Sequence, residues 1–233
     1  APLNYQTLVE AFPHYTDDDL VRAGLVISKD GRRRYDRFRH RVLFPLFDAR
    51  GALIGFGGRS LDGAEPKYLN SPETPLFSKG RELYGFFQAK EYIHKAGYAL
   101  VTEGYFDVLS LYQAGIKNVV ATTGTAVTSE QIRKLLRSTD RICFCFDGDA
   151  AGKKAAERAM LICLDVATDN RLFSFLFLPA GEDPDSFIRT YGRDRFDDLR
   201  SSATPLSSLL LQYCASNRDL TTLEGCAAMA NTA

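Results

Sequence analysis

A nine-residue stretch, residues 141–149 (RICFCFDGD), constrains the fold of this chain more than any other. Its apolar run ends abruptly in two carboxylates, Asp147 and Asp149, with Gly148 between them. Such a run is typical of a central strand in a parallel sheet, which is buried on both faces. Open α/β sheets bind their ligands just beyond the carboxyl ends of such strands. We therefore expect the Asp pair to hold a divalent metal ion; capping of the following helix is the alternative.

The second half of the chain has the alternation of an α/β fold with a parallel sheet and right-handed crossovers. The expected strands cover residues 98–102, 118–123, 141–146 and 171–178, and the expected helices cover 105–114, 128–137 and 150–167. Residues after Pro205 favour helix. A parallel sheet brings the carboxyl ends of its strands to one edge, so residues that follow these strands are expected to meet there.

Three of the four expected strands are followed by acids, and a further acid lies one turn into the helix after the first strand. These candidate metal ligands are Glu103, Asp107, Asp147, Asp149, Asp183 and Asp185. For Asp183 and Asp185 a simple turn is the alternative. An acid cluster on one sheet edge repels itself unless a cation neutralises it. Oxygen ligands without His or Cys nearby suit Mg²⁺ or Mn²⁺, so zinc is not expected.

Charge is distributed unevenly, although the 233 residues carry a formal net charge of zero. Residues 22–95 contain 15 Lys and Arg against 8 Asp and Glu, whereas residues 103–198 contain 12 against 15. A basic half joined to an acidic half is what a polyanion and a metal site would need, with random scatter as the alternative.

An arginine-rich segment carries much of the basic charge. Residues 29–34 are expected to form a polar turn around Asp30 and Gly31. Residues 35–47 are expected to form a strand in which Arg37, Arg39 and Arg41 share one face. Three Arg side chains on one face repel each other, which favours a phosphate partner over a solvated face. Residues 65–81 are expected to form an ordered loop.

The five Cys residues form no C-x-x-C pair, which indicates reduced thiols in a cytoplasmic protein. Cys143 and Cys145 share one face of the expected strand and are interpreted as core packing. No apolar stretch is long enough to cross a bilayer, and the N-terminus lacks a signal pattern, so no membrane partner is expected.

Several motifs resemble a known family. VTEGYFDVLSLYQAGIKNVVATTGT, followed by CFDGDAAGKKAA, is similar to the Toprim domain. Five further motifs resemble the RNA-polymerase core of bacterial DnaG-type primases, and the resemblance covers essentially the whole chain. They are YDRFRHRVLFP, IGFGGR, KYLNSPET, FSKGRELYG and GEDPD.

This resemblance implies DNA-templated synthesis of short RNA primers by metal-dependent nucleotidyl transfer from ribonucleoside triphosphates. It implies catalytic roles for Glu103, Asp147 and Asp149 as metal ligands, with Glu103 as general acid or base as the alternative. The other three acids complete a second ion site or its outer shell. The implied residues for template, primer or nucleotide are Arg37, Arg39, Arg59, Lys67 and Lys79. Position 40 is His, whereas relatives often have Asn or another polar residue.

The resemblance also implies an organisation that is mixed α/β (α+β overall). A basic, incomplete N-terminal lobe covers residues 1–95, a Toprim-like parallel sheet with flanking helices covers 96–200, and a truncated helical segment covers 201–233. Neither a Cys/His zinc ribbon nor a C-terminal helicase-binding domain is recognised, so we expect a fragment.

The expected partners are single-stranded DNA template, RNA primer, ribonucleoside triphosphates and, through the absent C-terminal domain, the replicative helicase. A monomer at the bacterial replication fork is expected. Two alternatives stay open. One is another Toprim enzyme, a nuclease or a topoisomerase; the other is a nucleic-acid-binding module without activity.

Overall fold

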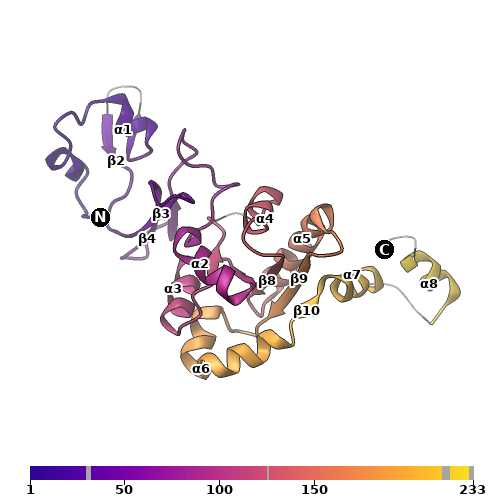
Figure 1. Ribbon diagram of the computed structural model, residues 1–233. Coiled ribbons are helices and arrows are strands. Elements are labelled where there is room, and N and C mark those ends of the chain that lie inside the picture. Colours follow the sequence, from indigo (N-terminus) through magenta and orange to yellow (C-terminus); the bar gives the residue numbers. More distant parts are fainter. Residues whose placement is uncertain (30–32, 125, 217–220, 231–233) are drawn as a thin grey trace. The chain divides into compact units, whose positions relative to one another are not determined.

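The computed structural model describes residues 1–29, 33–124, 126–216 and 221–230 (Figure 1). Its internal contacts divide the chain into two compact units. Unit 1 comprises residues 1–87 and 123–125, and unit 2 comprises residues 88–122 and 126–233. The finer division at residues 95 and 200 stays a prediction. Asp30 and Gly31 of the expected polar turn lie outside the described residues.

Unit 1 is built on short antiparallel strands. Strands β1 and β2 pair as a two-stranded ribbon, and β3, β4 and β5 form a three-stranded sheet in that order. The elements are η1 (Thr7–Glu10), α1 (Asp18–Arg22), β1 (Val26–Lys29), β2 (Arg33–Asp36), β3 (Arg41–Phe47), β4 (Leu53–Ser60) and β5 (Tyr68–Asn70). The β3–β4 connection is a turn in which the Asp48 carboxylate accepts hydrogen bonds from the backbone N–H groups of Arg50 and Ala52.

The continuous strand expected over residues 35–47 is wrong. Strand β2 ends at Asp36 and β3 begins at Arg41, and between them His40 has a φ of 49°. The backbone N–H of Arg37 donates to the carbonyl of Leu25, and that of His40 donates to Pro2. These long-range bonds replace a ladder, so the two-residue alternation does not apply here. The loop expected over residues 65–81 is also interrupted, by β5.

Unit 2 contains the parallel sheet that the sequence predicts, in the order β10-β9-β8-β6-β7. All neighbouring pairs are parallel except β10 with β9. Its strands are β6 (Ala99–Thr102), β7 (Val119–Ala121), β8 (Arg141–Phe146), β9 (Leu172–Phe177) and β10 (Thr204–Pro205). The helices are α2 (Phe86–Ala96), which begins in unit 1, α3 (Tyr105–Gln113), α4 (Ser129–Leu135), α5 (Ala150–Val166), α6 (Pro184–Ser201), α7 (Leu206–Ala215) and α8 (Leu223–Ala230).

The strand order creates a topological switch point. From β6 the chain moves to β7 on one side, and it then returns past β6 to β8 on the other side. Helix α3 packs against α6, whereas α5 packs against α4 and α7. In open α/β sheets the ligand crevice lies at such a switch point, which here is beyond the carboxyl ends of β6 and β8.

Aromatic packing holds β8 and β9 together behind this crevice. Phe144 lies opposite Phe175, and Phe146 lies opposite Phe177. The rings stack with centroids 5.4 Å apart in the first pair and 6.1 Å in the second. Cys143 and Cys145 are buried and free, as expected for core packing. Among the described residues, no helix is long and apolar enough to span a membrane.

Helix α6 is an element that the sequence reasoning missed. Asp183 is its N-cap and accepts a hydrogen bond from the backbone N–H of Ser186 at 2.7 Å, while Pro184 occupies the first helical position. Both are helix-start signals, so the turn interpretation of this segment is wrong. Gly192, with a φ of 77°, interrupts the helix midway.

Candidate functional site

The acids predicted from the sequence follow neighbouring strands of unit 2. Glu103 directly follows β6, and Asp147 directly follows the adjacent strand β8. Asp149 follows two residues later, and Asp183 comes after β9, the next strand in the sheet. We call the set Glu103, Asp107, Asp147, Asp149, Asp183 and Asp185 the acid edge.

Gly148 allows the Asp pair to sit in this position. Its backbone N–H donates to the carbonyl of Glu182 at 3.1 Å. A Cβ atom at residue 148 would collide with the backbone carbonyl groups of Leu178 and Pro179. These two residues directly follow the neighbouring strand β9. Only glycine therefore permits the chain to pass this close to the backbone that follows β9. The glycine between the two Asp residues is thus explained by backbone packing.

Two acids of the edge use part of their carboxylate to organise the backbone. Asp149 is the N-cap of α5 and accepts from the N–H of Gly152 at 2.7 Å. Asp107, in the first turn of α3, accepts from the N–H of Gly104 at 2.9 Å. Helix capping, the alternative interpretation of Asp149, is therefore present. A cap engages one oxygen atom, however, and a carboxylate has further lone pairs for other contacts.

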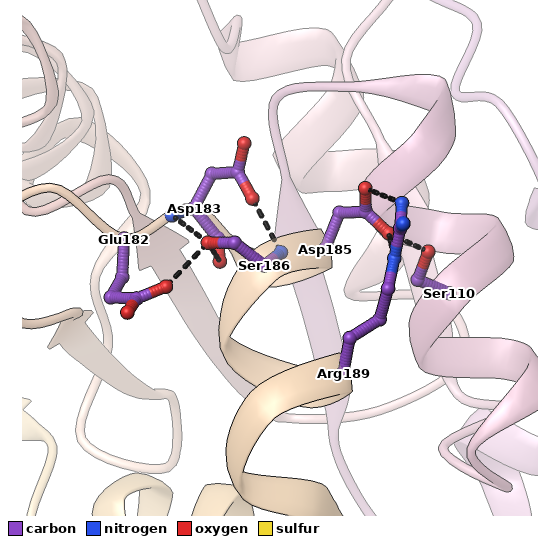
Figure 2. A network of polar contacts seen from close by, with 6 residues as sticks. All are labelled: Ser110, Glu182, Asp183, Asp185, Ser186 and Arg189. Atoms are coloured by element: carbon purple, nitrogen blue, oxygen red, sulfur yellow. Dashed lines mark hydrogen bonds and ion pairs between the residues drawn. The ribbon is translucent and has the colours of Figure 1, made fainter.

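Asp183 and Asp185 lie at the start of α6 in a polar network (Figure 2). Asp185 accepts hydrogen bonds from the Ser110 hydroxyl of α3 and from the Arg189 guanidinium one turn along α6. Asp183 caps the helix, and the hydroxyl of Ser186 donates to Glu182. Arg189 neutralises part of the charge of Asp185, so Asp185 differs from the acids that follow β6 and β8.

The acids lie near enough for their charges to act on one another. Burial raises the pKa of Asp107 to about 7, and the charges of Asp147, Asp183 and Asp185 act in the same direction. Burial likewise raises the pKa of Asp147 to about 6, with contributions from Glu103, Asp183 and Asp149. Glu103 reaches solvent, yet partial removal of water from its carboxyl group, and then the charge of Asp149, raise its pKa too.

This surplus of negative charge fits a divalent cation. The donors are all carboxylate oxygens, which Mg²⁺ and Mn²⁺ prefer, and a bound cation would remove the repulsion that raises the pKa values. Within the described part of the chain, no three His, Cys, Asp or Glu side chains are grouped closely enough to hold one ion. The acid edge therefore has the chemistry and the charge of a metal site without the ligand geometry of a closed one.

The basic residues predicted for nucleic acid lie in unit 1, and we call residues 33–41 the arginine segment. Arg37 donates through Nε and Nη2 to the carbonyl of Asn70, at 3.2 and 3.0 Å, and burial lowers its pKa. The guanidinium of Arg39 lies over two tyrosine rings that meet edge to face. Arg41 is buried and donates to the carbonyls of Gly58 and Lys67. Fixed carbonyl dipoles and π-faces therefore hold these cations.

The other three predicted cations lie on β4, beside β5 and in the loop after it. The guanidinium of Arg59 and the ammonium of Lys67 lie 6.0 and 5.9 Å from the ring centroid of Tyr68. The backbone N–H of Lys79 donates to Glu73, and its carbonyl accepts from the hydroxyl of Thr123. Sequence reasoning missed the aromatic partner Tyr68, although its position directly after Lys67 is a usable signal.

One cavity of about 530 Å³ collects the three central arginines. Its lining residues are Leu3, Tyr5, Ile27, Tyr35, Arg37, Arg39, His40, Arg41, Ser60, Asp62, Ala64, Glu65, Pro66 and Leu69. The arginines thus share one cavity, although they do not share one face of a strand. His40, the residue at which relatives often have Asn, also lines this cavity. Its Nδ1 atom lies 3.1 Å from a carboxylate oxygen of Asp62.

Comparisons with known proteins place both halves of the chain. Residues 1–90 match the family model of the DNA primase catalytic core, N-terminal domain, and residues 100–188 match a Toprim-like model. A DNA primase from Neisseria meningitidis is 48% identical over the whole chain, and a DNA primase from Escherichia coli K12 is 43% identical. The chain spans 39% and 40% of the length of these two relatives.

Solved structures agree. The chain is similar to a DNA primase domain from Pseudomonas aeruginosa, with a TM-score of 0.94 and 45% identity over 99% of this chain and 73% of that one. It is also similar to a DnaG primase catalytic domain bound to single-stranded DNA, with a TM-score of 0.91 and 42% identity over 99% of this chain and 75% of that one.

Proposed function

Because the chain belongs to the DnaG primase family, we propose that it synthesises short RNA primers on a single-stranded DNA template. The 3′-hydroxyl of an initiating nucleotide or primer attacks the α-phosphate of an incoming ribonucleoside triphosphate, and pyrophosphate leaves. The observation that carries this proposal is the convergence of the acid edge at the switch point between β6 and β8. Ligands of open α/β sheets bind at this position.

Glu103, Asp147 and Asp149 would hold Mg²⁺ or Mn²⁺, and Asp107, Asp183 and Asp185 would complete a second ion site or an outer shell. Bound ions of this kind supply charge stabilisation at the oxygen atoms of the transferred phosphoryl group. Ser110 and Arg189 hold Asp185 in place from α3 and α6. The Gly104 N–H and the Gly152 N–H fix one oxygen each of Asp107 and Asp149, so these carboxylates keep their orientation when a ligand arrives.

The cations of unit 1 contact phosphate groups in this proposal. Arg37, Arg39, Arg59, Lys67 and Lys79 neutralise the triphosphate and the backbone of template and primer. Such contacts are independent of sequence and sensitive to salt. The solved DnaG domain bound to single-stranded DNA supports a DNA partner for this chain. A nuclease, a topoisomerase or an inactive binding module is not favoured, because the relatives that match over the whole chain are DNA primases.

The relatives are longer than this chain, and we propose that further partners bind to regions outside the part that matches this chain. The replicative helicase would bind through a C-terminal domain beyond the present sequence. The protein would act as a monomer in the bacterial cytoplasm, at the replication fork.

The test compares the chain with its Asp147→Ala/Asp149→Ala variant on single-stranded template, ribonucleotides and Mn²⁺. We expect labelled oligoribonucleotides from the parent chain and a loss of at least about 100-fold in the variant. Asp140→Ala is the matched control, because Asp140 is exposed at the opposite end of β8. Cleavage of the template in place of RNA synthesis would overturn the proposal.

Metal binding is measured separately, so that the assignment of the ligands does not depend on activity. Titration of Mn²⁺ followed by electron paramagnetic resonance should show weaker binding in the double variant and unchanged binding in Asp140→Ala. Equal affinity in all three proteins would show that the acid edge does not hold the ion.

A further inference from the structure

The side chains of Tyr5, Arg39 and Tyr35 contact one another at the centre of the arginine segment, and we call these three residues the stack. The guanidinium carbon of Arg39 lies 4.8 Å from the ring centroids of both Tyr5 and Tyr35. The two rings also meet edge to face, with centroids 6.3 Å apart. The Nη1 atom of Arg39 donates to the carbonyl of Asp36 at 2.8 Å, so three separate contacts fix this guanidinium. Fixing it in advance lowers the entropy cost of a later contact with an anion.

The stack borders two cavities of unit 1. One is the cavity that collects Arg37 and Arg41, which we call the Arg37 cavity. The other, also about 530 Å³, is lined by Tyr5, Lys29, Arg33, Arg34, Tyr35 and Arg39. We call this second one the hairpin cavity, because its further residues belong to β1 and β2. The stack residues Tyr5, Tyr35 and Arg39 line both cavities.

The hairpin cavity is strongly cationic. Four of its six lining residues carry a positive charge, and none of the residues that the structure places in its lining carries a carboxylate. Lys29 and Arg33 face each other in the antiparallel register of β1 and β2, and both are exposed. Arg34 is held by the carboxylate of Asp18 at 2.8 Å and by the carbonyl of Asp17 at 3.0 Å. Asp18 therefore offsets the charge of Arg34, and the other three cations of the lining, kept close together, favour a polyanion.

The two rings distinguish between polyanions. Tyr5 is 67% exposed, so its outer face is accessible, and Tyr35 is partly exposed. Exposed aromatic faces next to Arg and Lys are the surface on which single-stranded nucleic acid binds, since a base can stack while its phosphates meet the cations. An acidic peptide would use the cations and leave the rings unused.

We propose that the hairpin cavity binds phosphates of single-stranded DNA, and that the strand continues across the Tyr5–Arg39–Tyr35 stack into the Arg37 cavity. This proposal rests on the proposed function, because it extends the path of the template. It assigns contacts with nucleic acid to Lys29 and Arg33, and stacking to Tyr5 and Tyr35.

The test is the salt dependence of binding of a fluorescent short oligothymidylate, measured by anisotropy on the full chain. Lys29→Gln/Arg33→Gln should lower affinity on the order of fivefold to tenfold at about 0.1 M salt. It should also make the negative slope of log K against log salt shallower by about 1.4, since each phosphate contact with a single strand contributes about 0.7 to its magnitude. Arg22→Ala/Arg50→Ala is the matched control, because it removes two exposed cations of unit 1 that line neither cavity.

A charge-preserving exchange, Lys29→Arg/Arg33→Lys, should restore the parent slope, and thermal melting of all variants excludes unfolding as the cause. The proposal is wrong if the Gln variant and the control give the same slope. It is also wrong if the Gln variant loses affinity only for a fluorescent ribonucleoside triphosphate, or if a polyglutamate of equal charge competes as well as unlabelled oligothymidylate.

These outcomes are separate from those of the primase test, because binding needs neither metal nor turnover. A chain that makes primers, but binds DNA without using Lys29 and Arg33, would refute only this inference. A chain that makes no primers, but shows the expected change of slope, would refute only the proposed function.

Discussion

The acid edge of unit 2 and the arginine segment of unit 1 each concentrate one sign of charge, but their charges meet different surroundings. In the acid edge, burial and mutual repulsion raise the pKa values of Glu103, Asp107 and Asp147. In the arginine segment, backbone carbonyls accept from Arg37 and Arg41, and Arg39 lies over two rings. In the first region Arg189 offsets part of the charge of Asp185, yet the pKa values of the other three acids stay raised, whereas fixed dipoles and π-faces already stabilise the second.

The difference follows from what holds each region in place. Close-packed strands lie behind the acid edge, so its carboxylates can stay oriented with few polar partners of their own. Unit 1 has short strands, and its arginines depend on polar contacts between segments far apart in the sequence. Three substitutions separate these two modes of support, and their expected effects on stability decrease from Phe144→Ala through Asp36→Ala to Gly148→Ala.

Phe144→Ala should have the largest effect on stability. Phe144 is 1% exposed and stacks on Phe175 at the centre of the sheet. Truncation of such a side chain leaves a cavity and costs about 3–5 kcal/mol. Chemical denaturation of the parent and variant measures this change. Leu172→Ala, on the exposed edge of β9, is the control and should cost far less. Equal losses in the two variants would show that packing behind the acid edge is not what supports it.

Asp36→Ala should have the next effect, confined to unit 1. The buried Asp36 carboxylate accepts from the Tyr15 hydroxyl at 2.8 Å and from the Leu8 N–H at 3.0 Å. The substitution leaves both donors without their acceptor, which should lower the free energy of unfolding by about 2–4 kcal/mol. The Asp36 backbone also bonds to Tyr5 and Arg39, so affinity for oligothymidylate should fall as well.

Hydrogen exchange of the two units checks the result for Asp36→Ala, with the exposed Asp62→Ala as control. Faster exchange is expected for residues 1–41 and unchanged exchange for β8 and β9. Uniform acceleration over both units would contradict the view that separate interactions support the two regions.

Gly148→Ala should have the smallest effect on stability but a clear effect on the acid edge. The added methyl group meets the carbonyls of Pro179 and Leu178, and the shift needed to relieve this overlap costs about 1–3 kcal/mol. Asp147 and Asp149 flank the shifted residue, so Mn²⁺ affinity should fall several-fold. Ala151→Ser changes an exposed residue in the first turn of α5 and should leave Mn²⁺ binding unchanged. Parent-like Mn²⁺ binding by Gly148→Ala would show that the Asp pair tolerates displacement.

The structure bears out the sequence predictions best where a pattern is local. The apolar run ending at Phe146 predicted β8, and the helix expected over residues 128–137 is α4, which begins with a capping box of Thr128 and Gln131. Prediction failed at Arg37–His40, where hydrogen bonds to Leu25 and Pro2 replace the strand, and at α6, a helix that was not expected after Asp183. The metal and nucleic-acid roles of the side chains stay predictions.

By itself, the sequence determined approximately where each parallel strand lies, because burial on both faces makes each of them a short apolar run. It also determined that glycine stands between the two Asp residues. Only the tertiary structure decided that β6 lies beside β8, that the exit of β9 requires this glycine, and that Tyr5 lies on Arg39. These outcomes depend on which distant segments pack together. That choice is made by the summed burial and hydrogen bonding of the whole chain, which no local pattern records.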